Sequence, residues 1–319
     1  MNSLFAGLPR PFLVLAPMDD VTDTVFRQVI TNTAPADLFF TEFVNVDALQ
    51  SKGRESAIKK LKFSPQEKPL IAQIWGKVPK NFYQSAQEIV EMGFDGVDIN
   101  MGCPDKTIVK NGCCGALIKN QELASEIIDA VKNGVNNRLP VSVKTRIGFA
   151  NYDEDWLKFL FAKKLNMLSI HFRTVKEMSK VPARWDLAEK IVSLKNDISP
   201  DTTLVGNGDV LSRAGAEEIA EKYNLDGIMI GRGVFSDPFV FAKQSEWNSF
   251  APEKRIALFK EHVELFDSTW QGNERKIQTL NKFCKVYISD FDGSKELRAR
   301  LMQTKTTDEI LQILGEQVN

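Results

Sequence analysis

The chain has few cysteines, few histidines and no apolar run long enough to cross a membrane. Its 319 residues include four cysteines and two histidines, and so few cysteines argue against a disulfide framework and favour the cytoplasm. The cysteines lack the spacing of a zinc finger or zinc ribbon, so we expect no metal site. We also expect no membrane association, because the N-terminus lacks the basic and apolar regions of a signal peptide as well.

The chain also lacks an excess of charge of either sign, since its net charge is −1. Any binding of nucleic acid must therefore come from local patches. Residues 52–62 hold five basic residues and one acidic residue, a net charge of +4. Residues 275–305 hold eight basic and three acidic residues, a net charge of +5. From composition alone, a solvated helical face is the favoured explanation of each patch.

Short apolar runs alternate with longer amphipathic segments up to about residue 241. The predicted strands are residues 12–16, 38–41, 70–74, 97–100, 141–144, 168–171, 203–206 and 227–230. The predicted helices are residues 24–31, 80–92, 121–133, 153–165, 185–194 and 213–223, with a weaker candidate at 47–61. Eight strands alternating with helices favour an α/β fold, the closed parallel (β/α)8 TIM barrel. A doubly wound open sheet is the alternative, although no glycine-rich fingerprint follows the first strand.

The pattern changes in the last part of the chain. No strand is predicted from residue 252 onward, and residues 254–269, 274–289, 294–303 and 307–315 are predicted helices. Thr306 or Thr307 precedes Asp308 and Glu309, as in a helix N-cap followed by an acidic first turn. We therefore expect a barrel in residues 1–245 and a small all-helical domain in residues 246–319.

Polar side chains stand at the carboxyl ends of most predicted strands, where barrel enzymes place their chemistry. The fourth run ends in a turn that carries Asn100 and Cys103. A thiol there can act as nucleophile, acid or redox group, although a small buried cysteine is the commoner case. Other strand ends carry Gln73, Lys144 with Arg146, and His171 with Arg173. A whole set of amides, cations, a thiol and an imidazole indicates an active site.

The last two strands end in glycine turns, Asn207-Gly208-Asp209 and Gly231-Arg232-Gly233. Loops at these two positions of a barrel frequently bind phosphate, and Arg232 adds a planar cation. Gln73, Asn100, Lys144 and His171 offer polar groups to a planar ring, and a cation near a flavin stabilises its anionic reduced form. FMN has one phosphate and one polar ring system, so it would account both for the glycine turns and for the polar groups at the other strand ends.

Several motifs occur in the same order as in a known family. They are Ala16-Pro17-Met18, Thr41-Glu42, Asn100-Met101-Gly102-Cys103-Pro104, residues 143–146 and 171–174, Asn207-Gly208-Asp209 and Gly231-Arg232-Gly233. With these motifs the chain resembles the tRNA-dihydrouridine synthases along nearly its whole length. The helical tail, with Arg298 and Arg300, resembles the RNA-binding domain of that family.

The resemblance implies an FMN-dependent oxidoreductase that reduces a uridine of tRNA to 5,6-dihydrouridine, with NADPH or NADH as electron donor. Cys103 would be the general acid that protonates C5 while reduced flavin delivers hydride to C6. Asn100, Arg146 and Arg173 would lie on the substrate side, and Arg298 and Arg300 would contact tRNA. The implied FMN-binding residues are Ala16, Pro17, Met18, Gln73, Lys144, His171, Asn207, Gly208, Asp209, Gly231 and Arg232. We expect a monomer, because no long exposed apolar seam is evident.

The chain departs from the family pattern at Phe172 and Glu177 and, in the tail, at Asn281, Phe283 and Val286. We expect the departures in the tail to bear on which uridine is modified.

Two other functions remain open. Another FMN barrel that acts on a free pyrimidine would not need a basic tail. A non-catalytic tRNA-binding protein would have no need of Cys103, Lys144 and His171.

Overall fold

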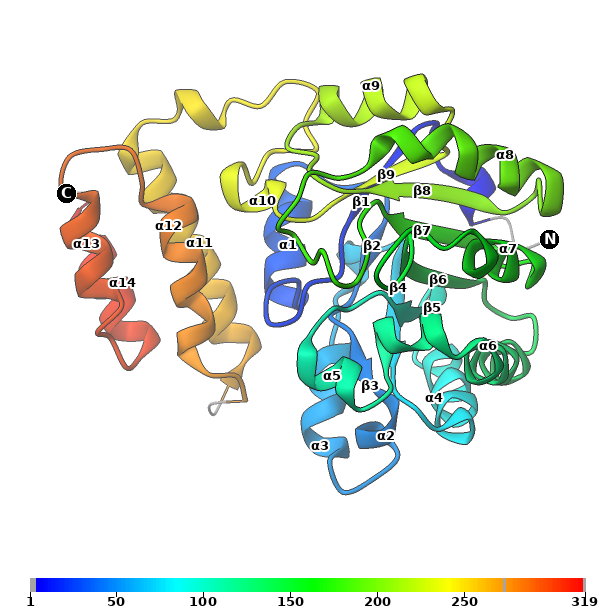
Figure 1. Ribbon diagram of the computed structural model, residues 1–319. Coiled ribbons are helices and arrows are strands. Elements are labelled where there is room, and N and C mark those ends of the chain that lie inside the picture. The colour runs from blue at the N-terminus through cyan, green and yellow to red at the C-terminus, as the bar shows by residue number, and fades with distance from the viewer. Residues whose placement is uncertain (1–3, 272–273, 318–319) are drawn as a thin grey trace.

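A parallel barrel forms the main body of the computed structural model, which describes residues 4–271 and 274–317 (Figure 1). The strand order is β1-β9-β8-β7-β6-β5-β4-β2, with every pair parallel, and a bridge between Val14 and Leu38 joins the two ends. The strands are β1 (Phe12–Leu15), β2 (Phe39–Phe40), β3 (Val44–Asn45), β4 (Leu70–Trp75), β5 (Gly96–Met101), β6 (Val141–Arg146), β7 (Met167–His171), β8 (Thr203–Asn207) and β9 (Gly227–Ile230). The predicted TIM barrel is confirmed.

The second barrel strand is divided into β2 and β3. Phe40 pairs with Ile71, and Val44 pairs with Ile74. Between these two pairs, the second strand therefore contains one residue more than the facing stretch of β4. The extra residue interrupts the ladder, as in a bulge. Glu42 lies in this interruption and is fully buried. The sequence predicted one strand here and did not predict the interruption.

The helices of the barrel follow the predicted order. They are α1 (Thr24–Thr33), α4 (Pro79–Glu91), α6 (Gln121–Val135), α7 (Glu154–Ala162), α8 (Ala188–Ile198) and α9 (Arg213–Tyr223). Side-chain caps fix several starts: Ser212 Oγ, for example, accepts a hydrogen bond of 3.1 Å from the Gly215 N–H. The weak candidate at 47–61 consists of three short pieces, α2 (Val46–Leu49), α3 (Arg54–Ala57) and the 3₁₀ turn Ile58–Leu61.

Additional short helices lie in the loops at the carboxyl face. α5 (Lys106–Lys110) and the 3₁₀ segment Cys114–Lys119 follow β5, and α10 (Gly233–Ser236) follows β9. Phe12 and Val14 of β1 face an inner apolar cluster that also holds Phe5, whereas Leu13 and Leu15 face the layer between strands and helices. This alternation closes the bottom of the barrel with side chains and leaves the carboxyl ends to form a site.

The C-terminal segment is helical and packs beside α1 and α10, as Figure 1 shows. It contains α11 (Pro252–Thr269), α12 (Asn281–Tyr287), α13 (Ser294–Leu301) and α14 (Thr307–Gly315). The helix predicted at 274–289 is shorter, because Lys276 is extended and a 3₁₀ turn, Ile277–Leu280, precedes α12. Thr306 is the N-cap of α14 and accepts from the Glu309 N–H. The domain boundary at 245–246, just before the 3₁₀ turn Trp247–Ser249, stays a prediction. In the described ranges, no helix is long and apolar enough to span a bilayer.

Candidate active site

A cavity of about 530 Å³ opens at the carboxyl ends of β1, β6, β7, β8 and β9. Ten of the eleven residues predicted to bind FMN line it: Ala16, Pro17, Met18, Lys144, His171, Asn207, Gly208, Asp209, Gly231 and Arg232. Arg173 also lines it, together with Ser179, Leu211 and Ser236, which the sequence analysis did not single out for a role. The predicted residues therefore do come together at one place.

Two arginines converge on Asp209 at one side of this cavity. Arg173 Nη2 donates to Asp209 Oδ2, and Arg232 Nη2 donates to Oδ1 at 2.9 Å. Burial raises the pKa of Asp209, but these guanidinium groups and the Ala183 N–H outweigh it and hold the pKa below its ordinary value. Asp209 is thus a fixed anion that orients Arg232 at the rim, where its side chain is 61% exposed.

The glycine turns beside Asp209 present unpaired backbone donors. Within the described residues, the N–H groups of Gly208, Gly231 and Arg232 have no protein acceptor. Gly208 has a φ of +142°, which a residue with a side chain rarely adopts. A Cβ added at Gly231 would stand 3.5 Å from Ala16 Cβ and 3.8 Å from Met18 Sδ, inside the cavity lining. A side chain at position 231 would therefore take up space inside the cavity.

Lys144 and His171 supply polar groups on the floor of the cavity. Lys144 Nζ donates to Asn207 Oδ1 at 3.2 Å, and Asn207 Nδ2 donates to the Met229 carbonyl. Burial, with Arg146 nearby, lowers the pKa of Lys144 to about 8. Burial and the surrounding cations hold the pKa of His171 well below 6.5. Its Nε2 lies 3.0 Å from Arg173 Nη1, and because guanidinium can only donate, neutral His171 carries its proton on Nδ1.

Cys103 stands just beyond the carboxyl end of β5, in a turn fastened by Asn100. Asn100 Oδ1 accepts hydrogen bonds from the Gly102 N–H at 3.1 Å and the Cys103 N–H at 3.0 Å. In the strand register Asn100 pairs with Lys144, so the turn adjoins the cavity floor. Burial raises the pKa of the Cys103 thiol above its ordinary value. The thiol is therefore protonated near neutral pH and is suited to donate a proton.

Arg146 and Gln73 do not line the cavity. Arg146 Nε donates to the Gly102 carbonyl at 2.8 Å, and its Nη1 donates to the carbonyls of Thr174 and Met178. Gln73 is fully buried, and its amide bonds to Asp98 and Asn100. Both side chains therefore hold protein groups around the Cys103 turn, while their assignments to substrate and FMN stay predictions.

The two tail arginines predicted to contact tRNA have partners within the tail. Arg298 Nη1 donates to the Ile288 carbonyl at 2.5 Å, and Arg300 Nη2 bonds to Glu316 Oε2 at 2.6 Å. A second cavity, of about 520 Å³, is lined by Lys282 and Lys285 of α12. Ser236 lines both this cavity and the first, so the two adjoin each other. Lys282 and Lys285 thus line a cavity next to the first, whereas Arg298 and Arg300 line neither of the two.

Two departures from the family pattern are accommodated by packing. Phe172 is fully buried and stacks on Trp185 with ring centroids 4.5 Å apart, and Trp185 Nε1 donates to the Gly208 carbonyl. Phe283 is buried against Phe26 and His262. Phe172 therefore supports one glycine turn, and Phe283 joins the tail to α1.

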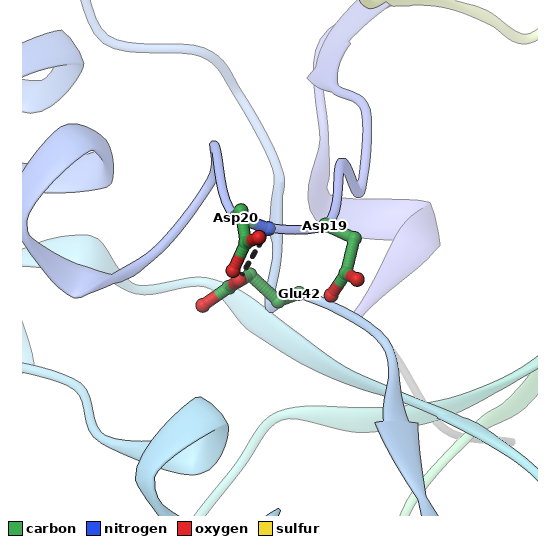
Figure 2. Close-up of side chains that lie close together, drawn as sticks. All are labelled: Asp19, Asp20 and Glu42. Carbon is green, nitrogen blue, oxygen red and sulfur yellow. Dashed lines mark hydrogen bonds between the residues drawn. The ribbon is translucent and has the colours of Figure 1, made fainter. Parts of the chain in front are cut away.

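A second contact between the tail and the barrel, made by Arg275, was not predicted from the sequence. Asp19, Asp20 and Glu42 bring carboxyl oxygens within 4.8 Å of one another, and Figure 2 shows these groups converging from the loops after β1 and β2. Arg275 forms ion pairs with Glu42 and Asp20, and Lys60 pairs with Asp19. Protein cations therefore neutralise this acidic cluster. The only signal in the sequence was the position of Glu42 after a strand.

Comparison with known proteins identifies relatives along nearly the whole chain. Residues 14–319 match the family described as "Dihydrouridine synthase (Dus)". The chain is 43% identical over 318 residues to a "Probable tRNA-dihydrouridine synthase" of Staphylococcus aureus (strain COL), with 99% of this chain and 95% of the relative covered. It is 43% identical over 318 residues to a "Probable tRNA-dihydrouridine synthase 2" of Bacillus subtilis (strain 168), with 99% and 96% covered.

Solved structures resemble the barrel at low sequence identity. A variant of NCR from Zymomonas mobilis superposes with a TM-score of 0.52 at 15% identity, covering 75% of this chain and 89% of that one. A morphinone reductase in complex with tetrahydroNAD gives 0.51 at 14% identity, covering 73% and 85%. These likenesses show the fold alone. The family match and the relatives at 43% identity show that the chain belongs to the dihydrouridine synthase family.

Proposed function

We propose that this dihydrouridine synthase reduces a uridine of tRNA to 5,6-dihydrouridine, using FMN and an electron supply from NADPH or NADH. The observation that carries the proposal is the cavity at the carboxyl ends of the strands, with Cys103 in the turn that adjoins its floor. The proposal also takes the enzyme to be a cytoplasmic monomer. Relatives at 43% identity whose names include tRNA support the choice of substrate.

The residues of the cavity fit FMN in both halves of that molecule. The free N–H groups of Gly208, Gly231 and Arg232, with the Arg232 guanidinium, would hold the phosphate. The Lys144 ammonium and the His171 Nδ1–H would donate to the polar edge of the ring system. A positive charge at that edge stabilises an anionic reduced ring. FMN, once reduced, supplies the hydride for the reaction.

Cys103 supplies the proton in this scheme. The uracil ring takes up a hydride at C6 and a proton at C5, so an acid must stand over C5. Because burial raises the pKa of Cys103, the thiol holds its proton until the ring develops negative charge. Asn100 and Arg146 act on this thiol by fixing the backbone of its turn, through the Cys103 N–H and the Gly102 carbonyl.

The helical tail and α10 would bind the body of the tRNA. Lys282 and Lys285 are exposed on α12, in the cavity that shares Ser236 with the proposed FMN site. Their charges attract phosphates, and a base extruded from the folded RNA can then enter the barrel. A protein that acts on free pyrimidines has no use for this second cavity.

The test begins with the purified protein. We expect it to be yellow, to release FMN on denaturation, and to form dihydrouridine in unmodified tRNA when NADPH is added. Free uridine and uracil serve as parallel substrates. Reduction of uracil but not of tRNA would show a free-pyrimidine enzyme instead. Binding of tRNA without any flavin or turnover would show a non-catalytic RNA-binding protein.

A further inference from the structure

A row of buried polar side chains crosses three neighbouring strands under the Cys103 turn. Asp98 of β5 is in register with Gln73 of β4 on one side and with Ser142 of β6 on the other. All three are almost completely buried. Asp98 Oδ1 accepts from Ser142 Oγ at 2.6 Å, and Oδ2 accepts from Gln73 Nε2 at 2.8 Å. Burial raises the pKa of Asp98 to about 7, while these two hydrogen bonds and the charge of Lys144 favour the carboxylate.

The row continues from Gln73 to the turn. Gln73 Oε1 accepts from Asn100 Nδ2 at 3.0 Å, and Asn100 Oδ1 accepts from the N–H groups of Gly102 and Cys103. A carboxylate only accepts hydrogen bonds, and a backbone N–H only donates. Hydrogen bonds at both ends of the row therefore favour the same orientation of the Gln73 and Asn100 amides. In this orientation each amide nitrogen points toward Asp98 and each amide oxygen points toward the turn.

We propose that Asp98 is a positioning residue for uridine reduction, because it orients the amide of Gln73 and, through it, the amide of Asn100 that holds Cys103 in place. This inference rests on the proposed role of Cys103 as proton donor. Asp98 itself contacts neither substrate nor cofactor in this scheme. An apolar side chain would fill the same space without the cost of burying a carboxylate, so packing alone does not account for Asp98.

An exchange of the amide and the carboxylate isolates this role. Gln73→Glu places two buried carboxyl groups against each other across the 2.8 Å contact, so they share one proton at neutral pH and repel each other at alkaline pH, where the row loses its polarity. Adding Asp98→Asn restores it, because position 98 then donates to position 73, and position 73 still accepts from Asn100. Asp98→Asn alone leaves an amide oxygen that can accept from Gln73, so its effect is the smaller of the two single changes.

The measurements separate orientation from general stability. Reduced enzyme is mixed with saturating unmodified tRNA, and flavin oxidation, flavin content and tRNA affinity are recorded for each variant. At alkaline pH, and relative to wild type at the same pH, we expect Gln73→Glu to slow oxidation on the order of 10²-fold, the loss that about 1 Å of misplacement causes. We expect unchanged tRNA affinity and recovery in the double variant. Ser169→Ala is the control, since Ser169 Oγ is a buried hydroxyl with no hydrogen-bond partner among the described residues.

Alkylation of Cys103 by iodoacetamide gives a second readout that needs no turnover. At alkaline pH we expect faster alkylation in Gln73→Glu than in wild type, because the turn loosens, and the wild-type rate in the double variant. A Gln73→Glu enzyme that equals wild type, or a double variant that does not recover, overturns the proposal. If Gln73→Glu fails to fold, the double variant alone tests the proposal: the wild-type alkylation rate supports it, and a faster rate overturns it. A wild-type enzyme that forms no dihydrouridine refutes the proposed function. In that case the alkylation rates of wild type, Gln73→Glu and the double variant still test whether Asp98 positions Cys103.

Discussion

Arg275 of the helical tail forms a two-pronged ion pair with Glu42 of the barrel. Arg275 Nη1 lies 2.9 Å from Glu42 Oε2, and Nη2 lies 3.0 Å from Oε1. Glu42 Oε1 also accepts from the Asp20 N–H at 2.6 Å, and Trp270 Nε1 donates to Asp23 at 3.1 Å. Carboxylates of the barrel, Glu42 and Asp23, therefore hold the segment after α11 against the loop that follows Met18. This contact fixes the tail beside the loops that follow β1 and β2.

Removal of the arginine from this ion pair should be costly. Arg275→Ala leaves the fully buried Glu42 carboxylate without its main counter-charge. Breaking a buried pair in this way typically costs about 3–5 kcal/mol in the free energy of unfolding. Urea unfolding followed by circular dichroism measures the change. Arg300→Ala is the matched control, because the Arg300–Glu316 pair is about half exposed and such pairs contribute about 0–1 kcal/mol. Equal losses in the two variants would contradict the structural reading of Arg275.

Local sequence patterns predict the strands, the helices and the strand ends, but not the contacts between distant segments. Strands and helices followed from apolar periodicity, and the strand ends collected Lys144, His171 and the glycine turns at one cavity because a parallel barrel brings all carboxyl ends together. Contacts between distant segments were beyond such reasoning. Arg275 and Glu42 are 233 residues apart, and nothing in either segment specifies the other.

Side-chain direction was also beyond the sequence. Arg146 follows Lys144 by two residues on β6, yet Lys144 faces the cavity whereas Arg146 reaches the Gly102 carbonyl. At the very end of a strand the loops, rather than the alternation of the strand, decide where a long side chain goes. The basic character of residues 275–305 likewise said nothing about which cations are neutralised within the fold.

Cys103→Ala should abolish most uridine reduction while the flavin stays bound. Without a positioned acid, the negative charge that develops on the uracil must be quenched by water, which typically slows the step by about 10²–10⁴-fold. Oxidation of pre-reduced enzyme by unmodified tRNA in a single turnover measures the effect. Cys113→Ala should be nearly silent, because Cys113 is buried in the loop after α5. A collapse in Cys113→Ala with near-normal oxidation by Cys103→Ala would mean that the proton comes from another thiol.

The raised pKa of Cys103 predicts how its reactivity depends on pH. Only the thiolate reacts with iodoacetamide, and burial disfavours the thiolate, so alkylation at pH 7 should be slower than that of a free thiol of the ordinary pKa. The rate should still rise with pH beyond the point at which glutathione levels off. Reduction of uridine should show the opposite trend and fall as the thiol loses its proton at alkaline pH. Peptide mass spectrometry quantifies alkylation at each pH. If the rate for Cys103 stopped rising at a lower pH than the rate for glutathione, the prediction would be contradicted.

Arg232→Ala should weaken retention of FMN without unfolding the protein. Its guanidinium is exposed at the rim, and a hydrogen bond to a charged group contributes about 1.5–3 kcal/mol, roughly a 10- to 150-fold change in the dissociation constant. Quenching of flavin fluorescence on titration of the apo-protein measures this constant. Arg213→Ala is a suitable control, because Arg213 lies on α9 and pairs with Glu217 away from the cavity lining. Unchanged affinity in Arg232→Ala would place the phosphate elsewhere.

The basic residues of the tail fall into two groups with different surroundings. Lys285 is exposed in the cavity that adjoins the proposed FMN site, whereas the charge of Arg300 is shared with Glu316. Lys285→Ala should weaken binding of tRNA, and each lost phosphate contact should reduce the slope of log affinity against log salt by about 1. Arg300→Ala should have a smaller effect on both quantities, and the reduction of bound flavin by NADPH should be unchanged in either variant. Filter binding at several salt concentrations gives the slopes. A flatter slope in Arg300→Ala than in Lys285→Ala would move the RNA-binding surface to α13, as the resemblance to the family's RNA-binding domain predicts.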